Sequence, residues 1–170
     1  MCRHTILAAE LTADDRVVDA SGLGTAAAAA AAAWVRRGAL TIVLPHAQHA
    51  AAASVLAGHP DSDRIDLAVG ELETLPITHG AADVAWAIDA IGRWRDPTQC
   101  VAALRRVLRP GGRLILTTPV ASCGLPGGEK EDPSALQALL TQGGFRGVQV
   151  RRYQDGERRI LVFMARRPWS

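Results

Sequence analysis

The stretch RVVDASGLGT, residues 16–25, decides how this chain of 170 residues is expected to fold. Val17 and Val18 form a short apolar strand, Asp19 ends it, and Gly22 and Gly24 lie in the small-residue loop that follows. Eight alanines at 26–33 come next, and alanine is the strongest helix former. A strand, a glycine loop and a helix in this order predict a ligand-binding loop at the first strand of an α/β sheet.

The chemistry of this loop indicates which ligand it suits. Glycines let the backbone approach a ligand closely, and the N-terminus of the helix offers free N–H groups at the positive end of its dipole. A carboxylate at this position, Asp19, suits a ligand with amine or hydroxyl donors better than a pyrophosphate. Two plainer interpretations stay open: Asp19 caps its own loop, and Gly22 and Gly24 only form the turn.

Strand and helix patterns alternate along the remaining sequence. Further strands are predicted at 39–44, 65–69, 83–88 and 113–118, and helices at 25–37, 48–57, 97–108 and 134–142, with a helical turn at 6–11. The patterns at 147–153 and 158–166 flank Asp155 and Gly156, which predicts a hairpin with one antiparallel strand at the sheet edge. The expected fold is α/β, a doubly wound Rossmann-like sheet with helices on both faces, in a single domain over 1–170.

Charge gives little indication of a polyanionic partner. The net charge is +2 and the basic residues are dispersed. Their densest run, Arg151, Arg152, Arg158 and Arg159, lies on the predicted hairpin and favours a solvated sheet edge. A nucleic-acid patch is the alternative, and we expect no nucleic-acid partner.

The cysteines and the apolar runs indicate the cellular compartment in which the protein is expected. Cys2, Cys100 and Cys123 are odd in number and lack metal-ligand spacing, which favours reduced thiols in the cytoplasm. Cys2 and His4 make at most half a metal site, so no metal is expected. No apolar run reaches the roughly 18 residues of a membrane span, and no signal peptide is visible. We therefore expect a cytoplasmic protein without membrane contact.

Four further motifs follow the first loop in order. They are VGELETLPI at 69–77, AADVAW at 81–86, RDPTQCVAALRRVLRPGGRLILTTP at 95–119 and GGFRGVQVRRYQDGERRILVFMARRP at 143–168. With the first loop, this set resembles class I S-adenosylmethionine-dependent methyltransferases, of the type 11-like kind, over residues 16–167. The LRPGG turn at 108–112 is its most distinctive piece. The resemblance implies a seven-stranded sheet with six parallel strands and one antiparallel strand.

The resemblance also implies S-adenosylmethionine as cofactor and assigns residues to it. The first-strand acid, Asp19, lies near the methionine end in that family, and the glycine loop passes under the cofactor. The acid after the third strand contacts adenine, and residues after the fourth strand flank the methyl group. Carried over, the cofactor-binding residues are Asp19, Ser21, Gly22, Gly24, Glu71, Leu72 and Ile88, with Ala87 and Asp89 beside Ile88. No residue is assigned to catalysis.

The sequence departs from the family pattern at three places. The loop DASGLGT fits D-x-G-x-G-x-G only with one residue deleted, and Gly92-Arg93 replaces a common polar pair. The family also places an acid after the second strand to hold both ribose hydroxyls, whereas residues 44–46 read LPH. Losing one charge-assisted hydrogen bond, about 1.5–3 kcal/mol, weakens a ligand roughly ten- to a hundredfold unless His46 or Gln48 substitutes.

Three functions are compatible with these motifs. The first is a methyltransferase that acts on a small molecule. The second is an inactive methyltransferase-like protein, a pseudoenzyme that serves as a binding or assembly module in a homodimer or with a partner subunit. The third is a nicotinamide-dependent oxidoreductase, because residues 22–27 fit G-x-G-x-x-A, but an acid before the loop and none after the second strand argue against it. A Leu23 side chain filling the loop would favour the second function.

Other residues near the expected site have two interpretations each. His46 is a cofactor contact or structural, Asp89 a base or a capping acid, and Cys123 a site thiol or a bystander. Trp86 and Trp94 bracket the site or pack in the core, and Arg93 and Arg95 attract an acidic substrate or are merely exposed.

Overall fold

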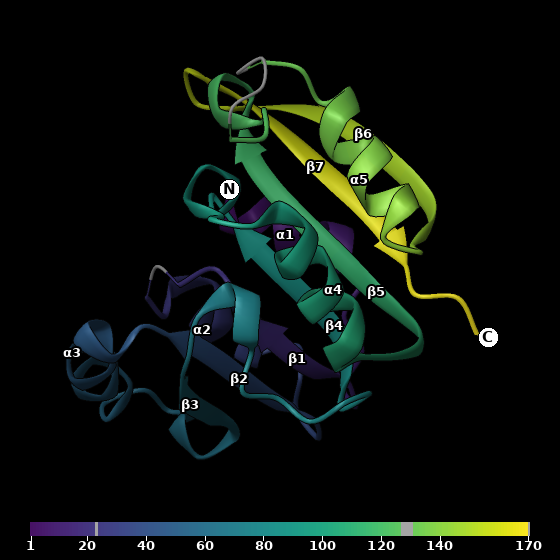
Figure 1. Cartoon of the computed structure of the whole chain (residues 1–170). Coiled ribbons are helices and arrows are strands. Elements are labelled where there is room, and N and C mark those ends of the chain that lie inside the picture. The colour runs from purple at the N-terminus through teal and green to yellow at the C-terminus, as the bar shows by residue number, and fades with distance from the viewer. Residues whose placement is uncertain (23, 127–130, 170) are drawn as a thin grey trace.

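The sheet of this computed structural model, which describes residues 1–22, 24–126 and 131–169, has seven strands in the order β3-β2-β1-β4-β5-β7-β6 (Figure 1). The strands are β1 (Arg16–Asp19), β2 (Ala39–Leu44), β3 (Ile65–Val69), β4 (Ala82–Ile88), β5 (Leu108–Pro119), β6 (Arg146–Asp155) and β7 (Arg158–Arg166). Only β7 runs antiparallel to its neighbours, β5 and β6. The predicted fold class, six parallel strands and one antiparallel strand, is confirmed.

The prediction that the antiparallel strand of the hairpin lies at the edge of the sheet is wrong. Strand β7 pairs with β5 on one side and β6 on the other, so β6 forms the edge. The burial of the two strands explains this order. Residues 160–163 of β7 are all buried, whereas most of the arginine-rich β6 is exposed, and an exposed charged strand suits a sheet edge.

Helices cover both faces of this sheet (Figure 1). The α-helices are α1 (Cys2–Ala9), α2 (Ala26–Ala32), α3 (His46–Leu56), α4 (Pro97–Val107) and α5 (Ser134–Gln142), and four short 3-10 turns are Ser62–Arg64, Leu72–Thr74, Ile91–Arg93 and Val120–Ser122. Buried residues of α1, α2 and α3 share one apolar cluster, and those of α4 and α5 share the other. No helix in the described ranges is long and apolar enough to span a bilayer.

Two helices differ from their predicted bounds by more than two residues at one end. The first is α1, which begins at Cys2 and not at residue 6. The second is α2, which ends at Ala32, five residues before the predicted end. Beyond it, the N–H groups of Arg37 and Gly38 donate to the carbonyl of Ala13, 2.8 and 2.9 Å away. This tertiary contact with the loop before β1 ends the helix, although the alanine run alone would continue it.

The α4–β5 junction combines a confirmed cap with a corrected boundary. Asp96 caps α4 by accepting the Gln99 N–H at 3.0 Å, as the sequence predicts. Residues 108–112, expected as a turn, already belong to β5, and its pairing with β4 shifts register between Ala82 and Val84. Gly111 makes this geometry possible with a φ of 76°, which non-glycine residues rarely adopt. The predicted loop 119–132 lies partly outside the described residues.

Candidate functional site

The sheet has its topological switch point between β1 and β4. From β1 the chain proceeds outward to β2 and β3, and from β4 it proceeds to β5 in the other direction. Connections therefore diverge above the carboxyl ends of these two strands, which is where α/β sheets bind ligands. The loop after β1 is tied to this end: the Ala20 N–H donates to the Trp86 carbonyl at 2.8 Å, and the Ile88 N–H donates to Ser21 Oγ at 2.9 Å.

Asp19, at the end of β1, is buried with only 2% of its surface exposed. Its Oδ1 accepts the Ser21 N–H at 2.9 Å, whereas its buried Oδ2 has no hydrogen-bond partner. Burial raises the pKa of this carboxyl, and the hydroxyl and N–H of Ser21 and the nearby Trp86 indole oppose the shift only in part. Asp19 thus caps its loop with one oxygen and leaves the other available to a donor.

A cavity of about 260 Å³, here called the Asp19 cavity, opens beside this carboxyl. It is lined by Met1, Cys2, Asp19, Ser21, Gly24, Ala26, Ala27, Ile88 and Asp89. Gly24 has a φ of 98°, and a Cβ on it would meet no atom within 4 Å, so the loop leaves open space there. Asp89 also adopts a positive φ, 51°, a conformation that concentrates at functional sites.

A second cavity of about 180 Å³, the Glu71 cavity, lies above β2 and β3. Its lining residues are Ala20, Gly22, Val43, Pro45, Gly70, Glu71, Leu72, Glu73, Leu75, Arg93 and Arg95. Glu73 already accepts the Arg95 N–H at 3.0 Å; burial opposes its charge, but backbone hydrogen bonds prevail and lower its pKa. Glu71 is exposed, and its carbonyl accepts the Thr74 N–H at 3.2 Å. Its carboxylate makes no hydrogen bond or ion pair with the described residues, so it is the carboxylate of this cavity that is free for a ligand.

The guanidinium of Arg93 lies at the boundary between the two cavities. Its Nη2 donates to the Ser21 carbonyl at 2.5 Å and to the Asp89 carbonyl at 3.2 Å, and both acceptor residues line the Asp19 cavity. Its Nη1 lies 3.4 Å from where a Cβ on Gly22 would stand. A ligand that extends through both cavities must therefore move this side chain. Neither interpretation of Arg93 from the sequence, an attraction for an acidic substrate or a merely exposed charge, includes this bridge to the Ser21 and Asp89 carbonyls.

The structure thus divides the predicted site residues into two groups. The first, around the Asp19 cavity, contains Asp19, Ser21, Gly24 and Ile88, and the second, around the Glu71 cavity, contains Gly22, Glu71 and Leu72. Leu23 lies outside the described residues, so its predicted role as a plug is left open.

Several other candidates are not part of either cavity. His46 and Gln48, proposed substitutes for a ribose acid, begin α3 and line neither space. Cys123 and Trp94 are buried in the core, which supports their plainer interpretations. Trp86 is buried as well, but its indole lies near the Asp19 carboxyl and so adjoins the candidate site. The described residues contain no cluster of three or more His, Cys, Asp or Glu side chains that could hold a metal ion.

Comparison with known proteins identifies the family. Residues 20–116 match the profile of a methyltransferase domain. The chain belongs to the class I S-adenosylmethionine-dependent methyltransferases. Malonyl-[acyl-carrier protein] O-methyltransferase of Hahella chejuensis is 38% identical to this methyltransferase domain over 107 residues, which are 63% of the chain and 31% of that protein. The chain spans only 16 to 38% of the length of six curated relatives.

Solved structures show the same methyltransferase fold at low sequence identity. The [4+2]-cyclase SpnF has a TM-score of 0.82 at 21% identity, covering 99% of this chain and 82% of that one. Phosphoethanolamine N-methyltransferase 2 of Haemonchus contortus, solved with S-adenosyl-L-methionine, has a TM-score of 0.78 at 14% identity, covering 98% and 52%. A cyclase with this fold demonstrates that the fold alone does not determine the reaction, which must be argued from the site.

Proposed function

We propose that the chain is an S-adenosylmethionine-dependent methyltransferase whose cofactor lies across the Asp19 and Glu71 cavities and whose acceptor is a small molecule. The observation that carries the proposal is the free, buried Oδ2 of Asp19 beside the Asp19 cavity. An unpaired buried carboxylate oxygen is costly, and an ammonium group is the donor that best offsets this cost. The methionine portion of the cofactor carries such a group.

The remaining lining fits the other parts of the cofactor. Gly22 and Gly24 present backbone without side chains where the cofactor would pass, and Ser21 is fixed by its bond to Ile88. Glu71 offers a free acceptor for an exocyclic amine in the Glu71 cavity. Residues 44–46, at the end of β2, include no carboxylate that could accept from ribose hydroxyls, so binding depends more heavily on Asp19 and Glu71. The structure of phosphoethanolamine N-methyltransferase 2 in complex with S-adenosyl-L-methionine, which has the same fold, supports S-adenosylmethionine as the cofactor.

Methyl transfer depends more on the relative position of donor and acceptor than on an acid–base group. When bound, the cofactor supplies a methyl group on a positively charged sulfur. Asp19 holds the ligand's amino group by an ion pair, and Ile88 and Asp89 form the wall past which an acceptor would approach. Placing donor and acceptor in line is itself worth several kcal/mol of barrier.

Isothermal titration with S-adenosylmethionine and with its demethylated product tests this function. We expect both ligands to bind and Asp19→Asn to weaken each at least tenfold, because a charge-assisted hydrogen bond becomes a neutral one. Asp66→Asn, which removes the same charge from an exposed position on β3, is the matched control and should change binding by less than twofold. Absence of heat at millimolar ligand would contradict the proposal.

A second function, a binding or assembly module without chemistry, is favoured by two observations. Arg93 bridges the boundary between the cavities, and no acid follows β2 at residues 44–46. This alternative predicts a stable homodimer or partner complex that the cofactor leaves unchanged. Sedimentation with and without the demethylated product distinguishes the two functions, because the module requires a complex and no ligand response.

A further inference from the structure

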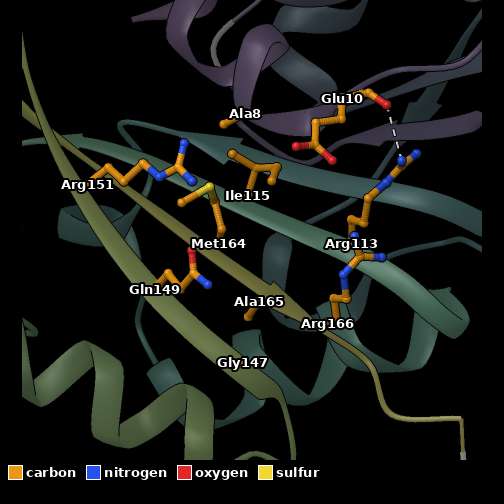
Figure 2. A pocket seen from close by; sticks show the side chains of 10 residues that line it. All are labelled: Ala8, Glu10, Arg113, Ile115, Gly147, Gln149, Arg151, Met164, Ala165 and Arg166. Atoms are coloured by element: carbon orange, nitrogen blue, oxygen red, sulfur yellow. Dashed lines mark hydrogen bonds between the residues drawn. The ribbon is translucent and has the colours of Figure 1, made fainter.

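A groove of about 350 Å³ lies away from the cofactor cavities, on the β5–β7–β6 face beside the end of α1 (Figure 2). It is lined by Ala8, Glu10, Arg113, Ile115, Gly147, Gln149, Arg151, Met164, Ala165 and Arg166. None of these residues lines the Asp19 or Glu71 cavity. The groove therefore needs an explanation of its own.

Arginines lie side by side across three strands at one end of this groove. Arg166 on β7 is paired in the ladder with Arg113 on β5 and with Arg146 on β6. Directly opposed residues on neighbouring antiparallel strands have their Cβ atoms about 4.5–5.5 Å apart, and like charges at that spacing destabilise a sheet. Figure 2 shows the side chains of Arg113 and Arg166 next to each other. A sheet that keeps this arrangement carries an electrostatic cost that a bound anion would relieve.

Most of these cations have no partner within the described chain. Arg113 is occupied, since it pairs with Asp15 and donates to the Glu10 carbonyl at 3.1 Å. Arg146, Arg151 and Arg166 make no side-chain hydrogen bond or ion pair among the described residues. The surrounding segment, 146–167, holds seven arginines against two acids in a chain whose net charge is only +2. Positive charge is thus concentrated on this hairpin, and two of its arginines, Arg151 and Arg166, line the groove.

Between its two cationic ends the groove has an apolar floor. Ile115 and Met164 are ladder partners two positions along from Arg113 and Arg166, and Arg151 lies opposite Val162 further along. Arg166 and Val162 are four residues apart on β7, so the charged ends are about 13 Å apart at the strand rise. A single small anion cannot reach both ends. An extended chain with acidic ends and an apolar centre can.

The lining also discriminates between classes of polyanion. Nucleic acids bind such surfaces by phosphate contacts and by stacking on aromatic rings, and none of the lining residues is aromatic. The Glu10 side chain, which also lines the groove, would repel a phosphate backbone. A polypeptide can accommodate Glu10 with one basic residue or a backbone N–H while its carboxylates meet the arginines.

We propose that this groove binds an acidic segment of a partner protein, with its carboxylates on Arg166 and Arg151 and an apolar side chain on Met164 and Ile115. Arg–carboxylate pairs are frequently bidentate, so the spacing of these arginines sets the register of the segment. The partner is separate from the methyl acceptor, because the groove and the cofactor cavities share no lining residue.

Fluorescence anisotropy with the full chain and a fluorescein-labelled peptide Glu-Glu-Leu-Leu-Glu-Glu tests the proposal. We expect saturable binding at low salt that weakens as salt is raised, and no binding of the peptide with glutamine in place of glutamate. The double variant Arg151→Gln/Arg166→Gln should weaken binding at least tenfold, since two charge-assisted contacts are lost. Arg158→Gln/Arg159→Gln removes the same charge from the same hairpin outside the groove and should weaken it less than threefold.

Thermal unfolding keeps the test independent of folding defects. The groove variant should melt no lower than the parent, because Arg166→Gln removes a like charge opposed to Arg113 and Arg146, and Arg151 makes no side-chain hydrogen bond or ion pair with the described residues. Three results would overturn the proposal: no peptide binding by the parent at millimolar concentration, equal losses in the two double variants, or tighter binding of a labelled six-nucleotide thymidine strand than of the acidic peptide. The last result would indicate a nucleic-acid surface.

Discussion

At the scale of single residues, the burial of Asp19 lowers the stability of the fold at neutral pH and leaves one carboxylate oxygen without a partner. Folding takes a carboxylate out of water and leaves Oδ2 without a partner, and this burial raises the pKa of the Asp19 carboxyl above its ordinary 3.8. The folded chain therefore binds the proton more tightly than the unfolded chain does. The contribution of Asp19 to stability is most favourable below pH 3.8 and declines as pH rises from 3.8 through the folded pKa.

Asp19→Asn should accordingly stabilise the chain at neutral pH while it weakens cofactor binding. We expect the free energy of unfolding of the variant to exceed that of the parent at pH 7, with the difference shrinking as pH falls toward 3.8. Each unit of pKa shift corresponds to about 1.4 kcal/mol. Urea unfolding of both chains between pH 3.5 and 7 measures this difference. A difference that does not vary with pH would mean that Asp19 titrates normally in the fold.

Arg93 lines the Glu71 cavity and donates to carbonyls of residues that line the Asp19 cavity. Its guanidinium must leave the Ser21 and Asp89 carbonyls before a ligand extends through both, and giving up exposed charge-assisted bonds costs about 1 kcal/mol. Arg93→Ala should therefore tighten binding of the demethylated cofactor on the order of fivefold in a calorimetric titration. Arg95→Ala, which alters the Glu71 cavity alone, should leave the affinity within twofold. Weaker binding by Arg93→Ala would show that the side chain contacts the ligand instead.

At the scale of elements, the sequence predicts the bounds of those helices and strands whose ends are set by neighbouring residues. Strands β2 and β3 and helix α5 have their predicted bounds, since glycine or proline residues adjoin their ends in the sequence. Helix α2 is shorter than predicted because its end is set by the Ala13 carbonyl, on a segment distant in sequence. The predictions for the start of β5 and for the order of β6 and β7 were wrong for the same reason. Strand pairing decides both features, and a single sequence does not show which strands pair.

The residues of the candidate site also fall into those that the sequence predicts and those that only tertiary contacts reveal. Residues next to a strand end, such as Asp19 and Glu71, could be placed from the sequence because parallel strands bring their carboxyl ends together. The bridge from Arg93 to Ser21 joins residues 72 positions apart through a long side chain, and no spacing reveals it. The row formed by Arg113, Arg166 and Arg146 depends on ladder register and a bulge, so the same arginines looked dispersed in the sequence.

At the scale of the whole molecule, burial is distributed unevenly across the sheet. Six of the seven residues of β4 are buried, and β4 lies between β1 and β5 in the interior of the sheet. Helix α3, over the β2–β3 side, buries only Ala52 and Leu56 of its eleven residues, and Val55 on it is exposed. Local opening free energies follow such differences in buried apolar contact. The β2–β3 side of the sheet also carries the Glu71 cavity, so the weakly buried helix α3 adjoins half of the candidate site.

Native-state hydrogen exchange measures this gradient directly. We expect amides of α3 to exchange through a local opening at least about 2 kcal/mol below the free energy of global unfolding, with little dependence on denaturant. Amides of β4 should exchange only by global unfolding, because their hydrogen bonds to β1 and β5 lie inside the sheet and break only when the sheet does. Equal exchange free energies and denaturant slopes for α3 and β4 would contradict this. The chain would then unfold as a single cooperative unit, and α3 would be no more mobile than the centre of the sheet.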